Sequence, residues 1–126
     1  MHRIVRTTLR SSRSIIGAQQ QAVRAFATIK KYTKTHEWIE VDTETLEGRM
    51  GISEHAAKEL GDIVHVDLPD IGTEFKERDV VICVESVKTA ADVYQMVDGE
   101  IIGINEDFLD DPELVNREPE ENGWLV

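Results

Sequence analysis

A single lysine stands at the joint between two strand-like runs of this sequence. The first run is Val80–Val84, the second is Val93–Val97, and small or polar residues fill the segment between them around Lys88. Two β-rich runs with a short polar joint predict a hairpin, and a lysine at its tip points into water. Another enzyme can reach the amine there, so the position suits a lysine that carries a covalent cofactor. From position alone, an ordinary solvated surface lysine is the commoner alternative.

The residues around Lys88 resemble a known motif. Glu85, Ser86 and Val87 precede the lysine, small residues follow it, and Asp92 stands four positions later. This order is similar to the lipoyl-lysine segment of the glycine cleavage system H-protein family. Lipoyl domains of 2-oxoacid dehydrogenases usually carry Asp-Lys-Ala instead, and biotin carriers carry Met-Lys-Met. The resemblance implies that Lys88 bears lipoate in an amide bond, with Glu85, Ser86 and Val87 as flanking recognition residues.

The resemblance covers residues 31–126 and keeps the order of the family's segments. The similar segments are 32–38, 51–53, 60–64, 66–69, 99–101, 105–106, 112–116 and 122–125. Together they imply an all-β fold, the flattened β-barrel or sandwich of two antiparallel sheets (a barrel-sandwich hybrid), with short helical segments. Many short strands separated by turn residues independently favour a sandwich or barrel. The family usually continues with a helix beyond this point, and we expect a chain that ends at Val126 to differ in stability and partner docking.

Three further positions match a cleft that, in this family, shelters the loaded lipoyl arm. They are Thr35 and Glu37 in the first strand segment and Asp92 after the lysine. The arm's cargo is an aminomethyl group whose amine is protonated near neutral pH, and carboxylates in a partly dry cleft hold such a cation more strongly than in water. Excluding water would also slow loss of the group. The alternative is that both acids are ordinary surface residues. If the cleft is partly open to water, we expect that folding does not depend on either acid.

The resemblance implies a carrier and not an enzyme. Its partners would be the pyridoxal-phosphate-dependent glycine decarboxylase (P protein), the tetrahydrofolate-dependent aminomethyltransferase (T protein) and dihydrolipoamide dehydrogenase (L protein). A lipoate-attaching enzyme would modify the lysine. Two alternatives remain open: a carrier that passes lipoyl groups on to other lipoyl domains, and an unmodified β-sandwich used only for protein interaction.

The N-terminal residues 1–26 differ in composition from the rest of the chain. They carry five arginines among serine, threonine, glutamine and aliphatic residues, and no acid precedes Glu37. This composition is typical of a mitochondrial transit peptide, so we expect processing near Ala27, a carrier domain over 27–126 and a location in the mitochondrial matrix. The alternative is a basic arm for nucleic acid, although these arginines are spaced and not clustered. No apolar stretch approaches the ~20 residues of a membrane-spanning helix, so no membrane association is expected.

Charge and cysteine content exclude several classes of function. The chain has 14 basic and 25 acidic side chains, and without residues 1–26 nine basic ones face the same 25 acids, a net charge of about −16. Such a surface repels phosphate backbones, so nucleic acid binding is not expected. Cys83 is the only cysteine and lies in an apolar run, which predicts a buried structural thiol. The histidines at 36, 55 and 65 lack metal-ligand spacing, so no metal site is predicted.

Cap and turn residues divide residues 27–126 into short elements. Ser53 is suited to capping a helix over 54–60, and Gly61 stands where a left-handed residue ends one. Alternation over 63–68 predicts a strand with Val64, Val66 and Leu68 on one face. Further predictions are a turn at 98–99 between apolar pairs at 96–97 and 101–102, helical turns over 106–109 and from Pro112, and a last strand over 123–126 that buries Trp124.

Overall fold

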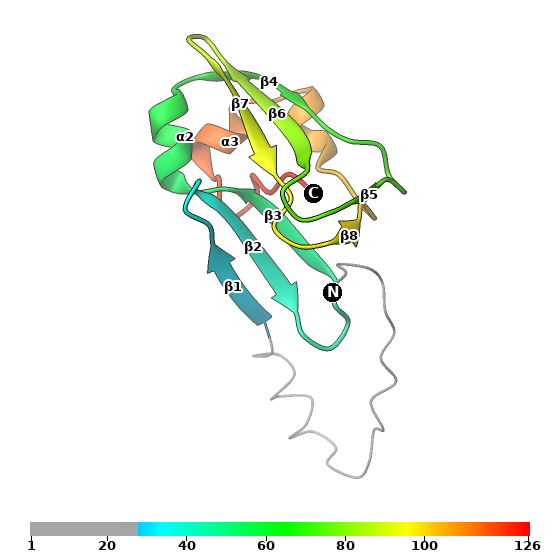
Figure 1. The fold of residues 1–126 in the computed structure, drawn as a ribbon. Helices are drawn as coiled ribbons and strands as arrows, with labels where there is room; N and C mark the ends of the chain where they lie inside the picture. The colour runs from blue at the N-terminus through cyan, green and yellow to red at the C-terminus, as the bar shows by residue number, and fades with distance from the viewer. Residues whose placement is uncertain (1–27) are drawn as a thin grey trace.

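Two antiparallel sheets make up most of the fold, which a computed structural model describes for residues 28–126. The first sheet has the order β1 (Thr28–Tyr32), β2 (Glu37–Asp42), β3 (Gly48–Ile52). The second has β6 (Val80–Ser86) in its centre, between β4 (Ile63–Asp67) and β7 (Ala90–Tyr94), and β5 (Glu74–Phe75) pairs separately with β8 (Gly99–Glu100). Figure 1 shows the β6–β7 hairpin projecting at one end of the molecule. The expected sandwich of two antiparallel sheets is confirmed, whereas the transit-peptide prediction lies outside the described residues.

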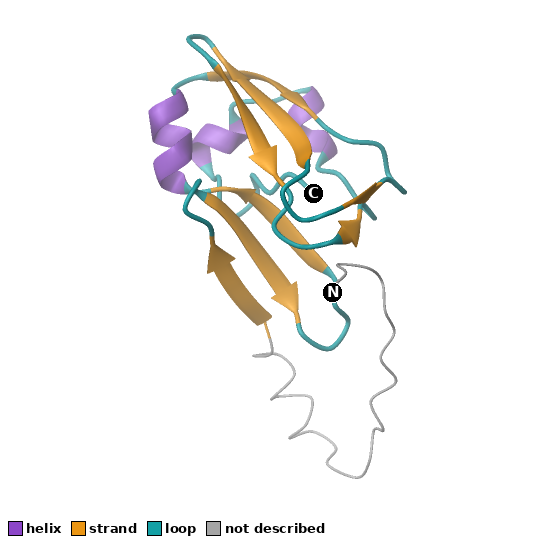
Figure 2. Cartoon of the chain, viewed as in Figure 1, coloured by secondary structure: helices purple, strands orange, loops and turns teal. Residues whose placement is uncertain are grey.

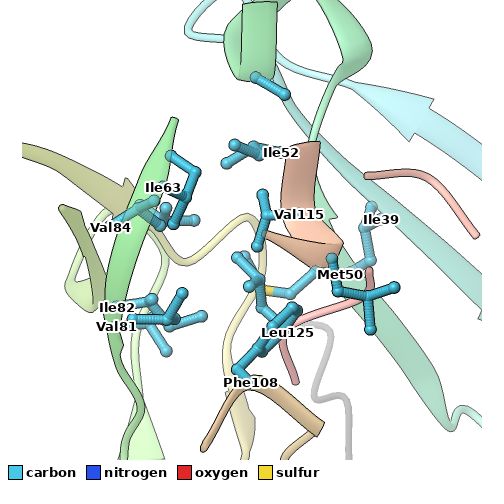
Figure 3. Packing of buried hydrophobic residues seen from close by; sticks show 14 of the residues in the cluster. Ile39, Met50, Ile52, Ile63, Val81, Ile82, Val84, Phe108, Val115 and Leu125 are labelled. Carbon is cyan, nitrogen blue, oxygen red and sulfur yellow. The ribbon is translucent and has the colours of Figure 1, made fainter. Parts of the chain in front are cut away.

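Apolar side chains from both sheets meet in one core. Ile39 and Met50 come from the first sheet and Ile82 and Val84 from the second, and all four are buried. Val115 also lies in this layer, as Figure 3 shows. Removing apolar surface from water stabilises the fold by roughly 25 cal/mol per Å². The core therefore fixes how far apart the two sheets lie.

Three short helical segments complete the described chain (Figure 2). They are α2 (Glu54–Leu60), the 3-10 turn η1 (Glu106–Leu109) and α3 (Leu114–Arg117). Both predicted caps of α2 are confirmed, because the Ser53 hydroxyl accepts the Ala56 N–H at 3.2 Å and Gly61 has a φ of +76°. The α3 helix begins two residues later than the predicted start at Pro112. No helix between residues 28 and 126 is long and apolar enough to cross a membrane.

The predicted alternation along β4 is wrong at its start. The ladder between β4 and β6 is irregular between Ile63 and His65, so the intervening residue is not paired in register. An extra residue in one strand reverses the inward and outward sides beyond it. Ile63 and Val66 are consequently the buried side chains, and Val64 is 51% exposed. Periodicity alone cannot reveal such an irregularity.

Two predictions near the C-terminus need correction. Residues 96–98 form a bend and β8 begins at Gly99, so the turn lies slightly earlier than the predicted 98–99, and Gly99 pairs with Phe75 of β5. Residues 123–126 do not form a strand, although the Leu125 N–H donates to Met50 O at 2.8 Å. Leu125 is fully buried in the core, while Trp124 is only half-buried and borders a hollow of about 450 Å³. The prediction that Trp124 is buried is therefore wrong, and the next residue, Leu125, faces the core instead.

Candidate functional site

Lys88 occupies the tip of the β6–β7 hairpin, as its sequence position predicted. The connection is the three-residue loop Val87–Thr89, closed by the Ser86 N–H, which donates to Thr89 O at 2.7 Å. Lys88 is exposed, and neighbouring Val87 is 69% exposed. An exposed amine on a short closed loop is accessible to a modifying enzyme. A group attached to it would extend from a well-defined backbone position.

The side chain of Ser86 shapes this tip from within. Its hydroxyl accepts the N–H groups of Lys88 at 3.3 Å and Thr89 at 3.1 Å, and it donates to Thr89 O at 3.1 Å. Serine commonly folds a turn by bonding to nearby backbone groups. Ser86 thus has an intramolecular role in the structure, whereas Glu85 and Val87 expose their side chains beside the lysine.

A cleft of about 320 Å³ adjoins the tip. The three residues of the predicted arm-sheltering cleft, Thr35, Glu37 and Asp92, all border it, and so does Thr89, the residue after the lysine. Its far wall comes from α2, through Ala56, Glu59 and Leu60. The structure therefore brings together residues from β7, α2, β2 and the turn before β2, and Glu37 and Asp92 among them are 55 positions apart in the sequence.

Glu37 borders the cleft and is a buried carboxylate. Only 2% of its surface is exposed, and one carboxylate oxygen accepts the hydroxyls of Thr33 and Thr35. The other oxygen accepts the Tyr94 N–H at 3.4 Å. Among residues 28–126 it makes no ion pair with a basic side chain. A buried charge without a partner of opposite sign is costly, so this carboxylate is poised to bind a cation.

Thr33 holds Glu37 in place, and the sequence analysis did not identify it. Besides donating to Glu37, its hydroxyl accepts the Glu37 N–H at 3.1 Å, and its own N–H donates to Glu37 O at 2.9 Å. His36, inside this turn, has a φ of +70°. Threonine four positions before a carboxylate carries no recognisable signal, since only the turn brings the two together. Glu37 is thus held within a folded turn, and whether folding depends on it stays a prediction.

Asp92 differs from Glu37 in its surroundings. It is exposed, and across the ladder it pairs with Cys83 on the central strand. Burial raises the pKa of the Cys83 thiol, and the negative charges of Asp92, Glu85 and Asp67 raise it further. Cys83 is half-buried where the sequence predicts a buried structural thiol, and its raised pKa agrees with an unreactive thiol. The two carboxylates of the cleft therefore differ in burial: Glu37 is buried and Asp92 is exposed to solvent.

Two histidines meet at the rim of the cleft, which their sequence spacing did not reveal. The rings of His36 and His55 have centroids 4.4 Å apart, and His55 lies 3.2 Å from the carboxylate of Glu59. His36 and Glu59 both border the cleft. Within the described part of the chain, no three histidine, cysteine or acidic residues are placed to hold a metal ion.

Comparison with known proteins agrees with this geometry. A family model described as glycine cleavage H-protein matches residues 30–126. The glycine cleavage system H protein of Thermotoga maritima is 50% identical over 97 residues, which cover 77% of each chain. That of Halothermothrix orenii is 50% identical over 95 residues, covering 75% of this chain and 73% of the relative. A crystal structure of the H protein from Mycobacterium marinum has a TM-score of 0.68 at 34% identity and covers 76% of this chain and 79% of its own. The chain belongs to the glycine cleavage H-protein family.

Proposed function

We propose that Lys88 carries lipoate and that the adjoining cleft holds the loaded end of the arm. The observation that supports this best is an exposed lysine on a closed tip next to a cleft bordered by a buried carboxylate that makes no ion pair within residues 28–126. The residues fit a lipoyl group with a cationic cargo, because the attachment point lies in water and the only dry charge of the cleft is negative. Thr33 and Thr35 would keep the Glu37 carboxylate oriented, and Asp92 would face the cargo from the wet rim.

The chain acts as a carrier of the glycine cleavage system and not as a catalyst. When bound, lipoate supplies a disulfide that accepts the aminomethyl group derived from glycine. The residues of this chain supply position, a negative site and protection from water. We propose the three enzymes of the system as partners: the glycine decarboxylase, the aminomethyltransferase and dihydrolipoamide dehydrogenase. We propose a lipoate-attaching enzyme as the fourth partner.

Mass analysis of the native protein and of Lys88→Arg tests the attachment site. Arginine keeps the positive charge and cannot form the lipoyl amide, so the variant should fold normally and lack the lipoyl mass. Lys76, on another loop, provides the control, because Lys76→Arg should remain fully lipoylated. Lipoate on a different lysine, or none on native protein, would contradict the assignment.

The exchange of bicarbonate into the glycine carboxyl group, catalysed by the purified decarboxylase, tests the carrier role. Lipoylated protein should support the exchange and Lys88→Arg should not. A lipoylated protein that supports no exchange but transfers its lipoyl group to other lipoyl domains would instead be the relay carrier. An unmodified native protein would be the interaction module considered above.

We propose further that residues 1–26 direct the chain to the mitochondrial matrix and are removed on import, leaving a domain of residues 27–126. The composition of five arginines and no acid supports this proposal. The relatives named above are bacterial, so the proposed mitochondrial location rests on the residues of this chain alone. N-terminal sequencing of protein from the organelle should begin near Ala27. A mature protein that begins at Met1 would refute the proposal.

A further inference from the structure

The hairpin tip rests on a short link between α2 and β4, and one side chain of α3 holds that link. The side-chain amide of Asn116 donates to Gly61 O at 2.7 Å, and its oxygen accepts the Ile63 N–H at 2.8 Å. The residue between them, Asp62, accepts the Val87 N–H at 3.0 Å. We call Gly61–Ile63 the tip platform. Asn116 thus forms hydrogen bonds with both ends of the tip platform, and the central residue, Asp62, accepts a hydrogen bond from the loop that carries Lys88.

Gly61 shows how closely the lysine approaches this platform. A Cβ atom on Gly61 would lie 3.3 Å from Lys88 Cε and 3.6 Å from Lys88 Nζ. The φ of +76° at Gly61 also disfavours any other residue there. The end of the lysine side chain therefore packs on the backbone that Asn116 holds.

These contacts form one continuous route from α3 to the carrier lysine. The tip itself has no other backbone bond to the rest of the described chain, since its remaining hydrogen bonds stay within the hairpin. We propose that Asn116 is a positioning residue for Lys88, which acts through the tip platform and keeps the tip in the geometry that the lipoate-attaching enzyme recognises. The part concerning that enzyme rests on the proposed function.

The first test measures the tip in unmodified protein. Asn116→Asp keeps an acceptor for the Ile63 N–H, removes the donor to Gly61 O and places a carboxylate oxygen against that carbonyl. Amide hydrogen exchange at Val87 should become at least about tenfold faster, while the amide of buried Val84 should change much less, because only the platform opens. Asn122→Asp is the matched control: Asn122 is exposed and donates only to the Glu118 side chain at 3.2 Å, so the Val87 amide should exchange as in wild type.

The second test measures recognition by the lipoate-attaching enzyme. If only a fraction of molecules present a competent tip, the apparent KM rises by the inverse of that fraction and kcat is preserved. Asn116→Asp should therefore raise KM several-fold at nearly constant kcat, and Asn122→Asp should change neither. Gly61→Ala perturbs the platform from the side of the lysine. It should also raise KM at nearly constant kcat, even if Asn116→Asp folds poorly.

The outcomes separate this inference from the proposed function. Equal acceleration of exchange at Val87 and Val84, or lipoylation kinetics in both platform variants that match wild type, would show that Asn116 stabilises the fold in general and does not position the lysine. Wild-type protein that is never lipoylated would overturn the proposed function, and the exchange result at Val87 would still decide whether Asn116 positions the tip.

Discussion

Replacing Glu37 with glutamine should release the cargo of the loaded arm faster than replacing Asp92 with asparagine. Glu37 is 2% exposed and accepts hydrogen bonds only from uncharged groups, whereas Asp92 is exposed at the rim. Both substitutions keep the shape of the side chain and remove its charge. The buried carboxylate should therefore account for most of the binding of the aminomethyl cation.

The difference in burial sets the size of the effect. Two unit charges in contact at about 4 Å attract by roughly 4 kcal/mol at an effective dielectric constant of 20 and by roughly 1 kcal/mol in water. Desolvation of the ammonium group offsets part of the larger value, so we expect a net loss of about 1.4–2.8 kcal/mol for Glu37→Gln. This corresponds to a release that is about 10–100 times faster. An exposed pair contributes about 0–1 kcal/mol, so Asp92→Asn should accelerate release by about fivefold at most.

The assay follows spontaneous release from isolated, loaded protein without partner enzymes. Asp67→Asn is the matched control, because Asp67 pairs with Cys83 from the opposite side and does not border the cleft. The effect of Glu37→Gln should persist at high salt, while that of Asp92→Asn should fade, since screening acts mainly on exposed charges. Glu37→Gln also disturbs the turn at Thr33, so release is measured below the unfolding transition of each variant. Equal release by wild type and Glu37→Gln would refute a role of the buried charge.

Three other outcomes follow from the described contacts. Leu125→Ala should lower the free energy of unfolding by about 2–5 kcal/mol in urea, while half-exposed Trp124→Ala should cost clearly less; the reverse order would contradict the observed packing. Burial alone would raise the pKa of Glu120, but hydrogen bonds from Tyr32, the Glu54 N–H and Lys30 together lower it. The stability that Glu120 contributes is thus complete above its unfolded pKa of about 4.3 and disappears as pH falls through the lower folded value, so wild type and Glu120→Gln should converge in acid. Alkylation of Cys83 should be slower than that of a free thiol and faster in Asp92→Asn, because part of its raised pKa comes from that carboxylate; identical rates in the two proteins would exclude this contribution.

Sequence patterns predicted the features that depend on neighbouring residues. Ser53 and Gly61 mark both ends of α2, because capping is decided within one turn of helix. The hairpin that carries Lys88 was predicted from two apolar runs and a polar joint. The grouping of Thr35, Glu37 and Asp92 came from family resemblance, and the structure brings them to one cleft.

The features that the sequence did not reveal depend on distant contacts. The irregularity beside Val64 arises where β4 pairs with β6, and the pairing of Gly99 with Phe75 joins segments 24 positions apart. Asn116 binds backbone groups more than fifty positions away, and nothing in its local sequence indicates this. Trp124 and Leu125 are adjacent apolar residues, and their sequence does not show which of them faces the core. Leu125 is the buried one, and its N–H binds Met50 O.

The two halves of the carrier site belong to different sheets. Lys88 extends from the β4–β6–β7 sheet, whereas Glu37 begins β2 of the other sheet, and the apolar core sets their separation. If Lys88 carries the proposed lipoyl arm, the thickness of the core sets the distance that this arm, whose covalent length is fixed, must span to reach Glu37. A core substitution that thickens or thins this layer by a methyl group would leave both site residues intact and still change where the arm ends. Tolerance to mutation in this protein should accordingly be narrower between the sheets than stability measurements alone would indicate.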